Sequence, residues 1–556
     1  MKRKRALDPY LYATADSPVD RRLMGQMKEQ DETPASIDTS APRFTLLVGP
    51  SPFTMPRGWE YYLTAPYEGA SYIATVIHNA GYPIRIVDVR YSPNPLEIAR
   101  REILSSTDVL GIATYEDNFP FVREIIDSTK EADPKMIIVC GGSLTTSVPH
   151  VFMQYSKTDI LVISEGELTI LELLESIARG TLAHDLPDIH GIVYRDSNGE
   201  VQRTPPRGQM TDLDCLPRMR LDLWPQARAP SGIQPQLITS FSRGCTMDCS
   251  FCFRTTPRVS AKSPEKFDAE LCWLKEQYNT SFLFFSDLTF NADVRQTREI
   301  CDVLEGYDFR WTSMCRCSYA DPPRLAAMAK AGCDIILYGV ESLGAEALKD
   351  VNKPTTESIS IRAMRRTLEA GIRFGALLIV GLPGETAEGL DHMASWAEQH
   401  QHIVRVKYLQ ALPGTPIYYD WLRRGLIKSE LDHLKWLSVE QSLPEDEFLN
   451  FNRFAEVDMR RTYQRIYEAY QPGPVMRFEH WPSHFEYFHP LPDNGAPHCV
   501  EYAGPNWRAD FSSAGPPLIP GSERFTLSKT GPLGAVEYGA MLATSGAVRQ
   551  AVSAKK

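Results

Sequence analysis

The sequence of 556 residues lacks any run of apolar residues that approaches the length of a membrane span. It also lacks a positive charge balance. The formal net charge is −11, whereas a domain that grips nucleic acid through its phosphates is normally basic. The basic start, residues 2–5, is not followed by an apolar stretch, so it does not predict a secretory signal. These absences argue against a membrane-spanning protein and against a nucleic-acid partner.

Cysteine is too scattered for a disulfide framework. The chain has 11 cysteines, an odd number in a long sequence, and this usage predicts a reducing, cytoplasmic setting. Three of them nevertheless stand together, at Cys245, Cys249 and Cys252. No second Cys-x2-Cys pair follows them in the sequence, and the His-x3-His spacing of His480 and His484 is not framed by a carboxylate–His helix motif. The group of three therefore calls for a chemical interpretation of its own.

Two series of alternating apolar runs and helical stretches predict the domains, and the length also predicts two or three cores. The first series predicts buried parallel strands at 44–49, 84–89, 109–114, 136–140 and 160–163. This pattern is typical of a flavodoxin-like, doubly wound α/β domain, which we expect over 43–190 after an N-terminal extension over 1–42. Such a sheet binds ligands outside the carboxyl ends of its strands.

A hairpin and a proline-rich linker are predicted over 191–235. The second series then predicts strands at 237–241, 281–285, 309–314, 335–339, 374–380 and 404–409. Strands that alternate with helices in this way predict a partial, TIM-like (β/α)6 barrel over 236–416. The smaller C-terminal region, 417–556, is expected to form a cap that is helical at 418–428 and 456–470 and irregular beyond.

The cysteine motif directly follows the first predicted barrel strand. Its spacing, Cys-x3-Cys-x2-Cys, places three thiolates on one loop at the carboxyl end of that strand, where they can converge on one face of an iron–sulfur cubane. Three ligands leave one iron open for a further ligand. The alternatives are a zinc site and chance clustering. Zinc sites usually pair Cys-x2-Cys with a second, distant pair, and this sequence has no second Cys-x2-Cys.

A Cys-x3-Cys-x2-Cys motif after the first strand of a (β/α) barrel resembles the radical S-adenosylmethionine (SAM) superfamily. The resemblance implies that Cys245, Cys249 and Cys252 bind a [4Fe–4S] cluster. It also implies that SAM chelates the open iron, and that reduction cleaves SAM to methionine and a 5′-deoxyadenosyl radical. Phe251 matches the aromatic residue that precedes the third cysteine in this family.

Further motifs follow the later barrel strands in the order of this family. Asp287 matches one acid of the second-strand motif, while Leu288 replaces the other. Four more residues match positions that reach SAM in the family: Arg316, Glu341, Ser342 and Gly381. Each motif alone is equally consistent with a structural turn or with a polar residue that faces the core, and Arg316 and Glu341 could simply pair with each other. Together, in this order, they favour a SAM site.

A flavodoxin-like domain ahead of such a barrel resembles the cobalamin-binding class of radical SAM enzymes. The segments that match are 67–74, 80–82, 141–143, 164–169, 191–194 and 204–206. The resemblance covers roughly residues 44–416 and implies cobalamin-binding residues at Thr114, Tyr115, Gly141, Gly142, Ser143, Glu165 and Gly166. Residues 49–56, after the first strand, contain no histidine for cobalt. Which side chain, if any, ligates the lower face of cobalt stays open.

The resemblance implies a reaction and its partners. A cobalamin-dependent radical SAM protein most often C-methylates its substrate, and here we expect a small natural product or a lipid-like molecule, bound between the two domains. An oxidative cyclase or rearrangement enzyme has the same domains, and a non-catalytic cobalamin or SAM sensor is the third alternative. A flavodoxin or ferredoxin is the implied electron donor. The aromatic, histidine-rich stretch 479–489 predicts either a cap over the active site or a flap packed on the barrel.

Overall fold

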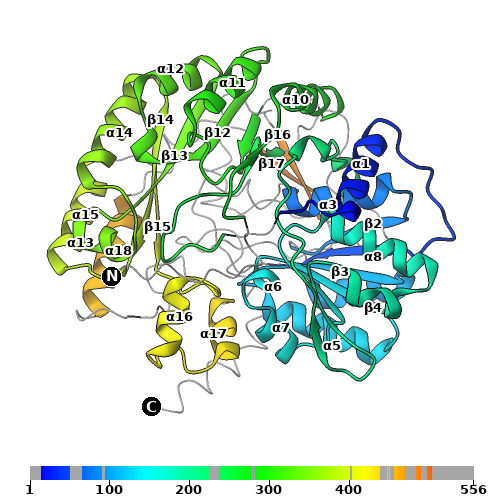
Figure 1. The fold of residues 1–556 in the computed structure, drawn as a ribbon. Coiled ribbons are helices and arrows are strands. Elements are labelled where there is room, and N and C mark those ends of the chain that lie inside the picture. Colours follow the sequence, from blue (N-terminus) through cyan, green and yellow to red (C-terminus); the bar gives the residue numbers. More distant parts are fainter. Residues whose placement is uncertain are drawn as a thin grey trace.

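Two sheets, one in each half of the chain, organise the protein into two lobes that lie side by side (Figure 1). We call them the N-terminal lobe and the barrel lobe. The computed structural model describes residues 14–50, 66–90, 94–224, 237–254, 256–278, 280, 282–400, 403–438, 448, 450 and 456–469, and the backbone of 484–489 and 498–503. In these ranges, no helix combines the length and the apolar composition that a bilayer crossing requires.

The N-terminal lobe contains a seven-stranded sheet with the strand order β2-β1-β3-β4-β5-β6-β7. Its strands are β1 (Phe44–Val48), β2 (Ile84–Asp88), β3 (Val109–Thr114), β4 (Ile137–Gly142), β5 (Ile160–Val162), β6 (Ile192–Arg195) and β7 (Val201–Arg203). The first five are parallel, as predicted, and the flavodoxin-like fold is confirmed. The hairpin β6–β7 adds two antiparallel strands to the same sheet, so the predicted boundary at residue 190 falls inside it.

Helices cover both faces of this sheet, because its strands carry apolar side chains on both sides. Leu46 packs in one hydrophobic cluster with Tyr72 of α3, whereas the next residue, Leu47, packs in the other cluster with Ile125 of α5. The helices of this lobe are α1 (Pro18–Glu32), α3 (Glu68–Asn79), α4 (Pro95–Ser106), α5 (Phe119–Ala132), α6 (Ser143–Ser147), α7 (Pro149–Tyr155), α8 (Glu167–Arg179) and α9 (Leu182–Asp185). Helix α1 places part of the predicted N-terminal extension against α3 and α8.

The barrel lobe is built on a six-stranded parallel sheet with the order β15-β14-β13-β12-β11-β8. The strands are β8 (Leu237–Thr239), β11 (Phe282–Phe285), β12 (Arg310–Cys315), β13 (Cys333–Glu341), β14 (Arg373–Val380) and β15 (Ile403–Tyr408). A short antiparallel pair, β9 (Ser242–Arg243) and β10 (Ser260–Ala261), brackets the cysteine motif. The predicted partial (β/α)6 barrel is confirmed.

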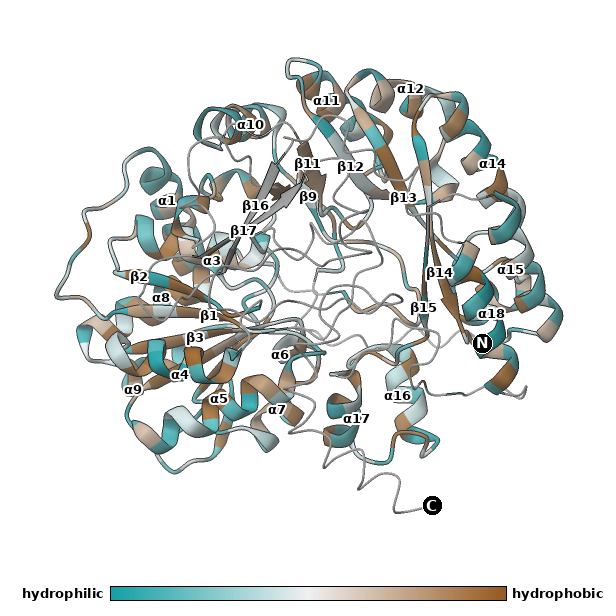
Figure 2. Cartoon of the chain, turned by 180° about the vertical axis from the view of Figure 1, so that it is seen from behind, coloured by the Kyte–Doolittle hydropathy of each residue, from teal (hydrophilic) through white to brown (hydrophobic). Residues whose placement is uncertain are grey.

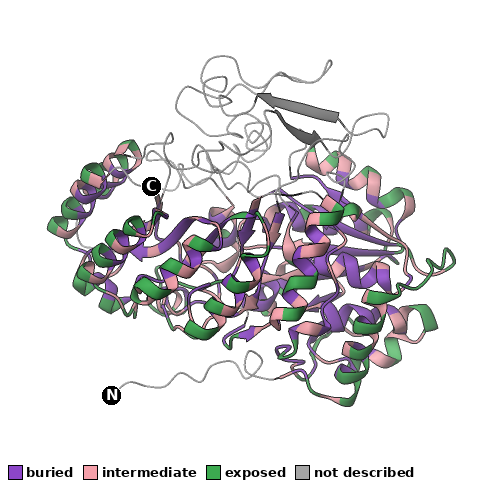
Figure 3. Cartoon of the chain, turned by 90° about the horizontal axis from the view of Figure 1, so that it is seen from above, coloured by how far each residue is buried: buried purple, intermediate pink, exposed green. Residues whose placement is uncertain are grey.

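An outer layer of helices covers the convex side of this sheet (Figure 1). It contains α10 (Pro264–Tyr278), α11 (Val294–Leu304), α12 (Pro322–Lys330), α13 (Ala345–Asp350), α14 (Glu357–Glu369) and α15 (Ala387–His400). Hydrophobic residues concentrate in the strands and on the inward faces of the helices (Figure 2). The strands are accordingly buried, while the exposed residues lie on the outer surfaces of the helices (Figure 3). Burial of the sheet therefore positions the carboxyl ends of its strands.

The C-terminal region contributes α16 (Pro416–Arg423), α17 (Glu430–Leu437) and α18 (Glu456–Ala469). Helix α18 packs on α15 and β15, and the Tyr463 ring stacks on Tyr408 with the centroids 4.1 Å apart. It thus completes the outer layer of the barrel lobe, although the predicted boundary at 416 assigns it to a cap. Of the aromatic stretch 479–489, only the backbone of β16 (His484–His489) is described, paired antiparallel with β17 (His498–Ala503); the rest lies outside the described residues.

Candidate functional site

The three predicted cluster ligands lie on one loop, residues 244–254, which we call the cysteine loop. Cys249 is buried, Cys245 is half-buried and Cys252 is exposed, and all three are free thiols. Protein atoms surround Cys252 although solvent reaches it. Desolvation therefore raises the pKa of its thiol to about 12, and the neighbouring Cys249, Cys245 and Glu341 contribute in the same direction. Within the described part of the chain, no three His, Cys, Asp or Glu side chains are already arranged to hold a metal ion.

The backbone of the cysteine loop is anchored on several sides. The Ser250 N–H donates to the Val351 carbonyl at 2.9 Å, and the Ser250 carbonyl accepts from Ile417 N–H at 3.1 Å. Gly244 has a φ of +100°, and a Cβ at this position would lie 1.7 Å from the Arg258 carbonyl oxygen. Only glycine fits so close to another backbone segment. The loop is therefore anchored at Gly244 and at Ser250.

Asp287, at the carboxyl end of β11, contacts the backbone that leads into this loop. Its carboxylate accepts from Phe241 N–H at 3.1 Å, from Ser242 N–H at 2.7 Å and from the Ser242 hydroxyl at 2.5 Å. Burial raises the pKa of Asp287 to about 6, although these hydrogen bonds act to lower it. The Asp287 carboxylate is thus occupied by hydrogen bonds to the protein itself, and it fixes residues 241–242, which precede the cysteines.

Replacement of this residue, Asp287→Ala, is expected to destabilise the barrel lobe by roughly 2–4 kcal/mol, because two buried N–H groups lose their acceptor. Chemical unfolding measures the loss, and hydrogen–deuterium exchange should increase at residues 241–242. Asp268→Ala, which removes an exposed carboxylate bonded to Tyr307, is the matched control and should change stability by less than about 0.5 kcal/mol. Unaltered exchange at 241–242 in the Asp287 variant would contradict the assignment.

Charged side chains gather at the carboxyl ends of β12 and β13. Glu341 Oε1 lies 2.7 Å from Lys353 Nζ, and both side chains are buried. Burial lowers the pKa of Lys353, but the Glu341 carboxylate and Cys249 outweigh that effect and the pKa is raised overall. Arg316, 8% exposed, has no hydrogen-bond partner for its Nε among the described residues. The predicted alternative of an Arg316–Glu341 pair is not what the structure shows, since Lys353 takes that place.

The backbone of Glu341 is strained, with a φ of +65° at a register shift in β13. Non-glycine residues in this conformation concentrate at functional sites. A Cβ on Gly339 would lie 2.5 Å from Glu341 Oε1 and 2.8 Å from Lys353 Nζ, so this glycine makes room for the ion pair. The neighbouring Ser342 is buried, and its hydroxyl accepts from Gly344 N–H at 3.1 Å. Gly381, at the end of β14, donates its N–H to Glu385 at 2.9 Å.

Sequence reasoning did not find Lys353. It lies after α13 in a loop whose only signal in the sequence is a lone positive charge, and nothing there distinguishes it from a solvated lysine. Phe251 lies in the cysteine loop and packs against a hydrophobic cluster that includes residues of α5, α7 and α16.

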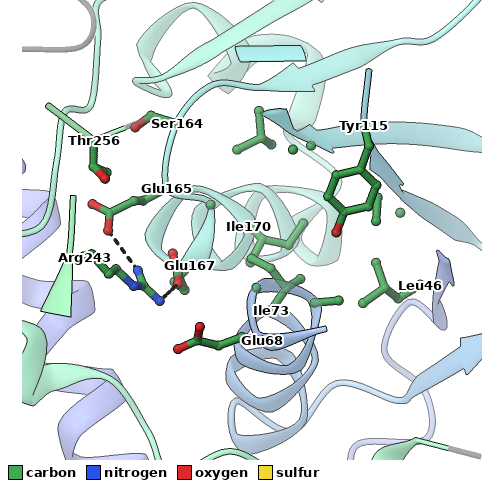
Figure 4. A pocket seen from close by; sticks show the side chains of 18 of the residues that line it. Leu46, Glu68, Ile73, Tyr115, Ser164, Glu165, Glu167, Ile170, Arg243 and Thr256 are labelled. Carbon is green, nitrogen blue, oxygen red and sulfur yellow. Dashed lines mark hydrogen bonds and ion pairs between the residues drawn. The ribbon is translucent and has the colours of Figure 1, made fainter. Parts of the chain in front are cut away.

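A cavity of about 360 Å³, which we call the interlobe cavity, opens at the carboxyl side of the first sheet and extends between the sheet and α3 and α8 (Figure 4). Of the residues predicted to bind cobalamin, the following line it: Tyr115, Gly141, Gly142, Glu165 and Gly166. Thr114 and Ser143 do not. The Thr114 hydroxyl donates to the Gly141 carbonyl at 3.1 Å, and the Ser143 hydroxyl donates to Glu116 at 2.9 Å.

Glycines form part of the wall of this cavity. Gly142 has a φ of +134°, and a Cβ there would lie 2.2 Å from the Thr114 carbonyl oxygen. At Gly166 a Cβ would come within 3.1 Å of the Ile73 side chain, directly in the cavity wall. The remaining wall is largely apolar, with Ile73 and Ile170 pointing inward (Figure 4). The cavity thus offers an apolar wall on which the flat face of a bulky ligand can lie, with charged and hydroxyl side chains at its edge.

The barrel lobe closes the other side of the interlobe cavity. Its contributions are Ser240, Ser242, Arg243, Gly244, Thr256, Ser286 and Leu288. Glu68, the first residue of α3, accepts hydrogen bonds from the hydroxyls of Ser240 and Ser286 and so ties the lobes together. Because Gly244 precedes Cys245, the cavity extends to the start of the cysteine loop.

Comparison with known proteins agrees with this geometry. Residues 239–397 match the Radical SAM superfamily, and residues 60–174 match the B12 binding domain. Residues 239–397 are therefore a radical SAM domain and residues 60–174 a B12-binding domain, the combination that the cobalamin-binding class of radical SAM enzymes has, and the protein is an enzyme. The two matched domains confirm the predicted cofactors, a [4Fe–4S] cluster, SAM and cobalamin.

The relatives that carry an activity in their names share little sequence identity with this chain. An uncharacterised methyltransferase of Pyrococcus horikoshii is 26% identical over 75% of this chain and 91% of its own length. The anaerobic magnesium-protoporphyrin IX monomethyl ester cyclase of Rubrivivax gelatinosus is 27% identical over 60% of this chain and 64% of its own length. The structure of the radical SAM methyltransferase TsrM from Kitasatospora setae, with cobalamin and a [4Fe–4S] cluster bound, matches with a TM-score of 0.55 at 18% identity. That match covers 69% of this chain and 78% of TsrM.

Proposed function

We propose that the protein is a cobalamin-dependent radical SAM methyltransferase that methylates a carbon of a small molecule. One observation carries the proposal. A single cavity joins the glycine-lined space of the N-terminal lobe to the barrel residues beside Cys245. Such a cavity brings the two cofactor-binding halves to one place, where a substrate bound between the lobes meets both. Relatives named as a hopanoid C-3 methylase and a cytidylyl-2-hydroxyethylphosphonate methyltransferase support a lipid-like or natural-product substrate.

The cysteine loop would hold the cluster through Cys245, Cys249 and Cys252, and three ligands leave one iron open for SAM. When bound, the cluster, SAM and cobalamin supply the electron, the radical and the carrier for the methyl group. The protein positions the cofactors and the substrate and excludes water from them. The anchored backbone of the loop fixes the three sulfurs on one side of the barrel mouth.

The amino-acid end of SAM would bind among Arg316, Glu341 and Lys353. The buried Nε of Arg316 offers an unused donor to a carboxylate, and Glu341 offers an acceptor to an ammonium group. Lys353 holds the Glu341 carboxylate in position. Ser342 and Gly381, at the ends of β13 and β14, stand where the nucleoside would follow.

Cobalamin would occupy the interlobe cavity at Tyr115, Gly141, Gly142 and Gly166. Cobalamin would fit here because the wall carries glycines. A Cβ on Gly166 would narrow the cavity, and a Cβ on Gly142 would collide with the Thr114 backbone. Tyr115 presents its ring to the cavity and contacts Tyr67 edge to face at 5.4 Å. Thr114 and Ser143 support this wall through the hydrogen bonds described above.

A cytoplasmic location and a one-electron donor such as flavodoxin or ferredoxin complete the proposal. All ten cysteines that the structure describes are free thiols, which suits a reducing compartment. A low-potential protein donor is the usual source of the electron for this cofactor set.

The test uses anaerobically reconstituted protein with hydroxocobalamin, a chemical reductant and SAM labelled in its methyl group. A methyltransferase forms 5′-deoxyadenosine and transfers the label to an added small molecule, with a mass gain of one methyl group. The second candidate, an oxidative cyclase, is favoured by the similarity to the Rubrivivax cyclase. It would form 5′-deoxyadenosine and an unlabelled product. Failure to consume SAM after reduction would contradict both and favour a sensor.

Lys353→Met is expected to weaken SAM binding by roughly 10–100-fold, because Glu341 then lies buried without its counter-charge. Equilibrium titration of cluster-loaded protein with SAM measures the change. Lys349→Met, which removes an exposed lysine paired with Glu346 on α13, is the matched control and should bind SAM as the unmodified protein does. Equal affinities in the two variants would refute the role of Lys353.

A further inference from the structure

Arg243 joins the two lobes at the wall of the interlobe cavity. Its guanidinium lies 2.8 Å from Glu165 and 2.7 Å from Glu167, one nitrogen to each carboxylate (Figure 4). The three side chains are only 17%, 8% and 5% exposed. The guanidinium also lies 5.0 Å from the centroid of the Tyr72 ring. We call this group, Arg243 with Glu165 and Glu167, the Arg243 clamp.

Both carboxylates lie where β5 leads into α8 in the N-terminal lobe, Glu165 in the turn and Glu167 as the first residue of the helix. Residues 165–167 form part of the cavity wall, and the middle residue is Gly166. Glu165 also accepts from Met210 N–H at 2.6 Å, so its position is fixed from a second side. A ligand that fills the cavity therefore rests directly on the turn that holds Arg243.

The opposite end of the clamp leads to the cysteine loop through two residues. Arg243 belongs to β9 and pairs with Ser260 of β10. The Gly244 backbone passes so close to Arg258 that a Cβ would lie 1.7 Å from the Arg258 carbonyl oxygen, and Cys245 N–H donates to the Thr256 carbonyl at 3.2 Å. Only Gly244 separates Arg243 from the first predicted cluster ligand along the chain. The position of the Arg243 backbone therefore bears directly on the position of Cys245.

We propose that Arg243 is a positioning residue that couples the two cofactor sites: cobalamin in the interlobe cavity packs on the turn that carries the clamp, and the clamp holds the start of the cysteine loop in the position that SAM needs. The inference rests on the proposed function, since it assigns cobalamin to the cavity and the cluster to the loop. Coupling of this kind is reciprocal, so SAM tightens cobalamin binding by the same factor. Arginine suits the task because its planar fork engages two carboxylates at once, whereas lysine offers a single point charge.

The chain contains a matched control. Arg207 is buried between Asp20 of α1 and Glu172 of α8, in the same arrangement of one guanidinium and two carboxylates. It does not line the interlobe cavity and makes no contact with the cysteine loop among the interactions described. Arg243→Gln and Arg207→Gln therefore each break a buried clamp, but only one of the two clamps is the proposed link.

The experiment measures the SAM dissociation constant of cluster-loaded protein by anaerobic titration, with and without saturating hydroxocobalamin. In the unmodified protein and in Arg207→Gln, hydroxocobalamin is expected to tighten SAM binding by about tenfold, within the usual range of coupling. In Arg243→Gln the factor is expected to fall below about twofold, while iron content and cobalamin absorption stay unchanged. Glu167→Gln removes only one of the two ion pairs and should give an intermediate coupling factor. If Arg243→Gln does not fold, Glu167→Gln tests the proposal in its place.

Each outcome is decisive. Unmodified protein that holds no cluster or no cobalamin would overturn the proposed function itself, and iron analysis and the corrinoid spectrum show this before any SAM titration. If both cofactors are present, an unchanged coupling factor in Arg243→Gln and Glu167→Gln would overturn the clamp alone. An equal loss of coupling in Arg207→Gln would do the same, because it would mark a general effect of lower stability.

Discussion

Replacement of Cys245, Cys249 and Cys252 together by alanine is expected to abolish the cluster and, with it, all cleavage of SAM. The fold should survive, because backbone contacts at Ser250 and Gly244 hold the cysteine loop without help from the thiols. Iron and sulfide analysis and electron paramagnetic resonance measure the cluster, and chromatography measures 5′-deoxyadenosine. Both signals should fall to the detection limit.

The control for this prediction is another free cysteine of the barrel lobe. Cys272 lies on α10, is half-buried and is outside the cysteine loop. Cys272→Ala should keep the full iron content and the full rate of SAM cleavage. A triple variant that still binds about four irons per chain would mean that other residues hold the cluster, and the interpretation of the loop would be wrong.

Gly166→Leu is expected to weaken cobalamin binding at least about 100-fold, or roughly 2.7 kcal/mol. The backbone of Gly166 lies in the right-handed helical region, with φ −103° and ψ −11°, so a larger residue meets no backbone strain. Its side chain would instead start 3.1 Å from Ile73 and grow into the interlobe cavity. Titration of cluster-free protein with hydroxocobalamin, followed by absorbance, measures the affinity separately from any activity.

Gly25→Ala is the counterpart of this variant. Gly25 lies on α1, does not line the cavity, and a Cβ at this position would have no atom within 4 Å. The alanine should leave cobalamin affinity unchanged and should stabilise the helix by about 0.5–1 kcal/mol. If Gly166→Leu binds hydroxocobalamin as tightly as Gly25→Ala does, cobalamin occupies some other place.

Much of the architecture follows from local pattern. Buried parallel strands give continuous apolar runs, and such runs at residues 109–114 and 374–380 predicted β3 and β14 within one residue. The extra strands β6 and β7 and the outer helix α18 were assigned to other domains. Both assignments failed for the same reason: pairing with β5 and packing on Tyr408 are contacts between distant segments, and no local pattern encodes them.

The sequence by itself determined the class of protein, because the spacing of three cysteines and the order of the strands are local properties of the chain. Only the tertiary structure decided which side chains work together. Lys353 meets Glu341, and Arg243 meets Glu165 and Glu167, across separations that the sequence leaves open. Asp287 likewise bonds to backbone N–H groups that only the folded sheet brings near. Ion pairs and hydrogen bonds act over a few ångströms, so their partners are fixed only when distant segments pack.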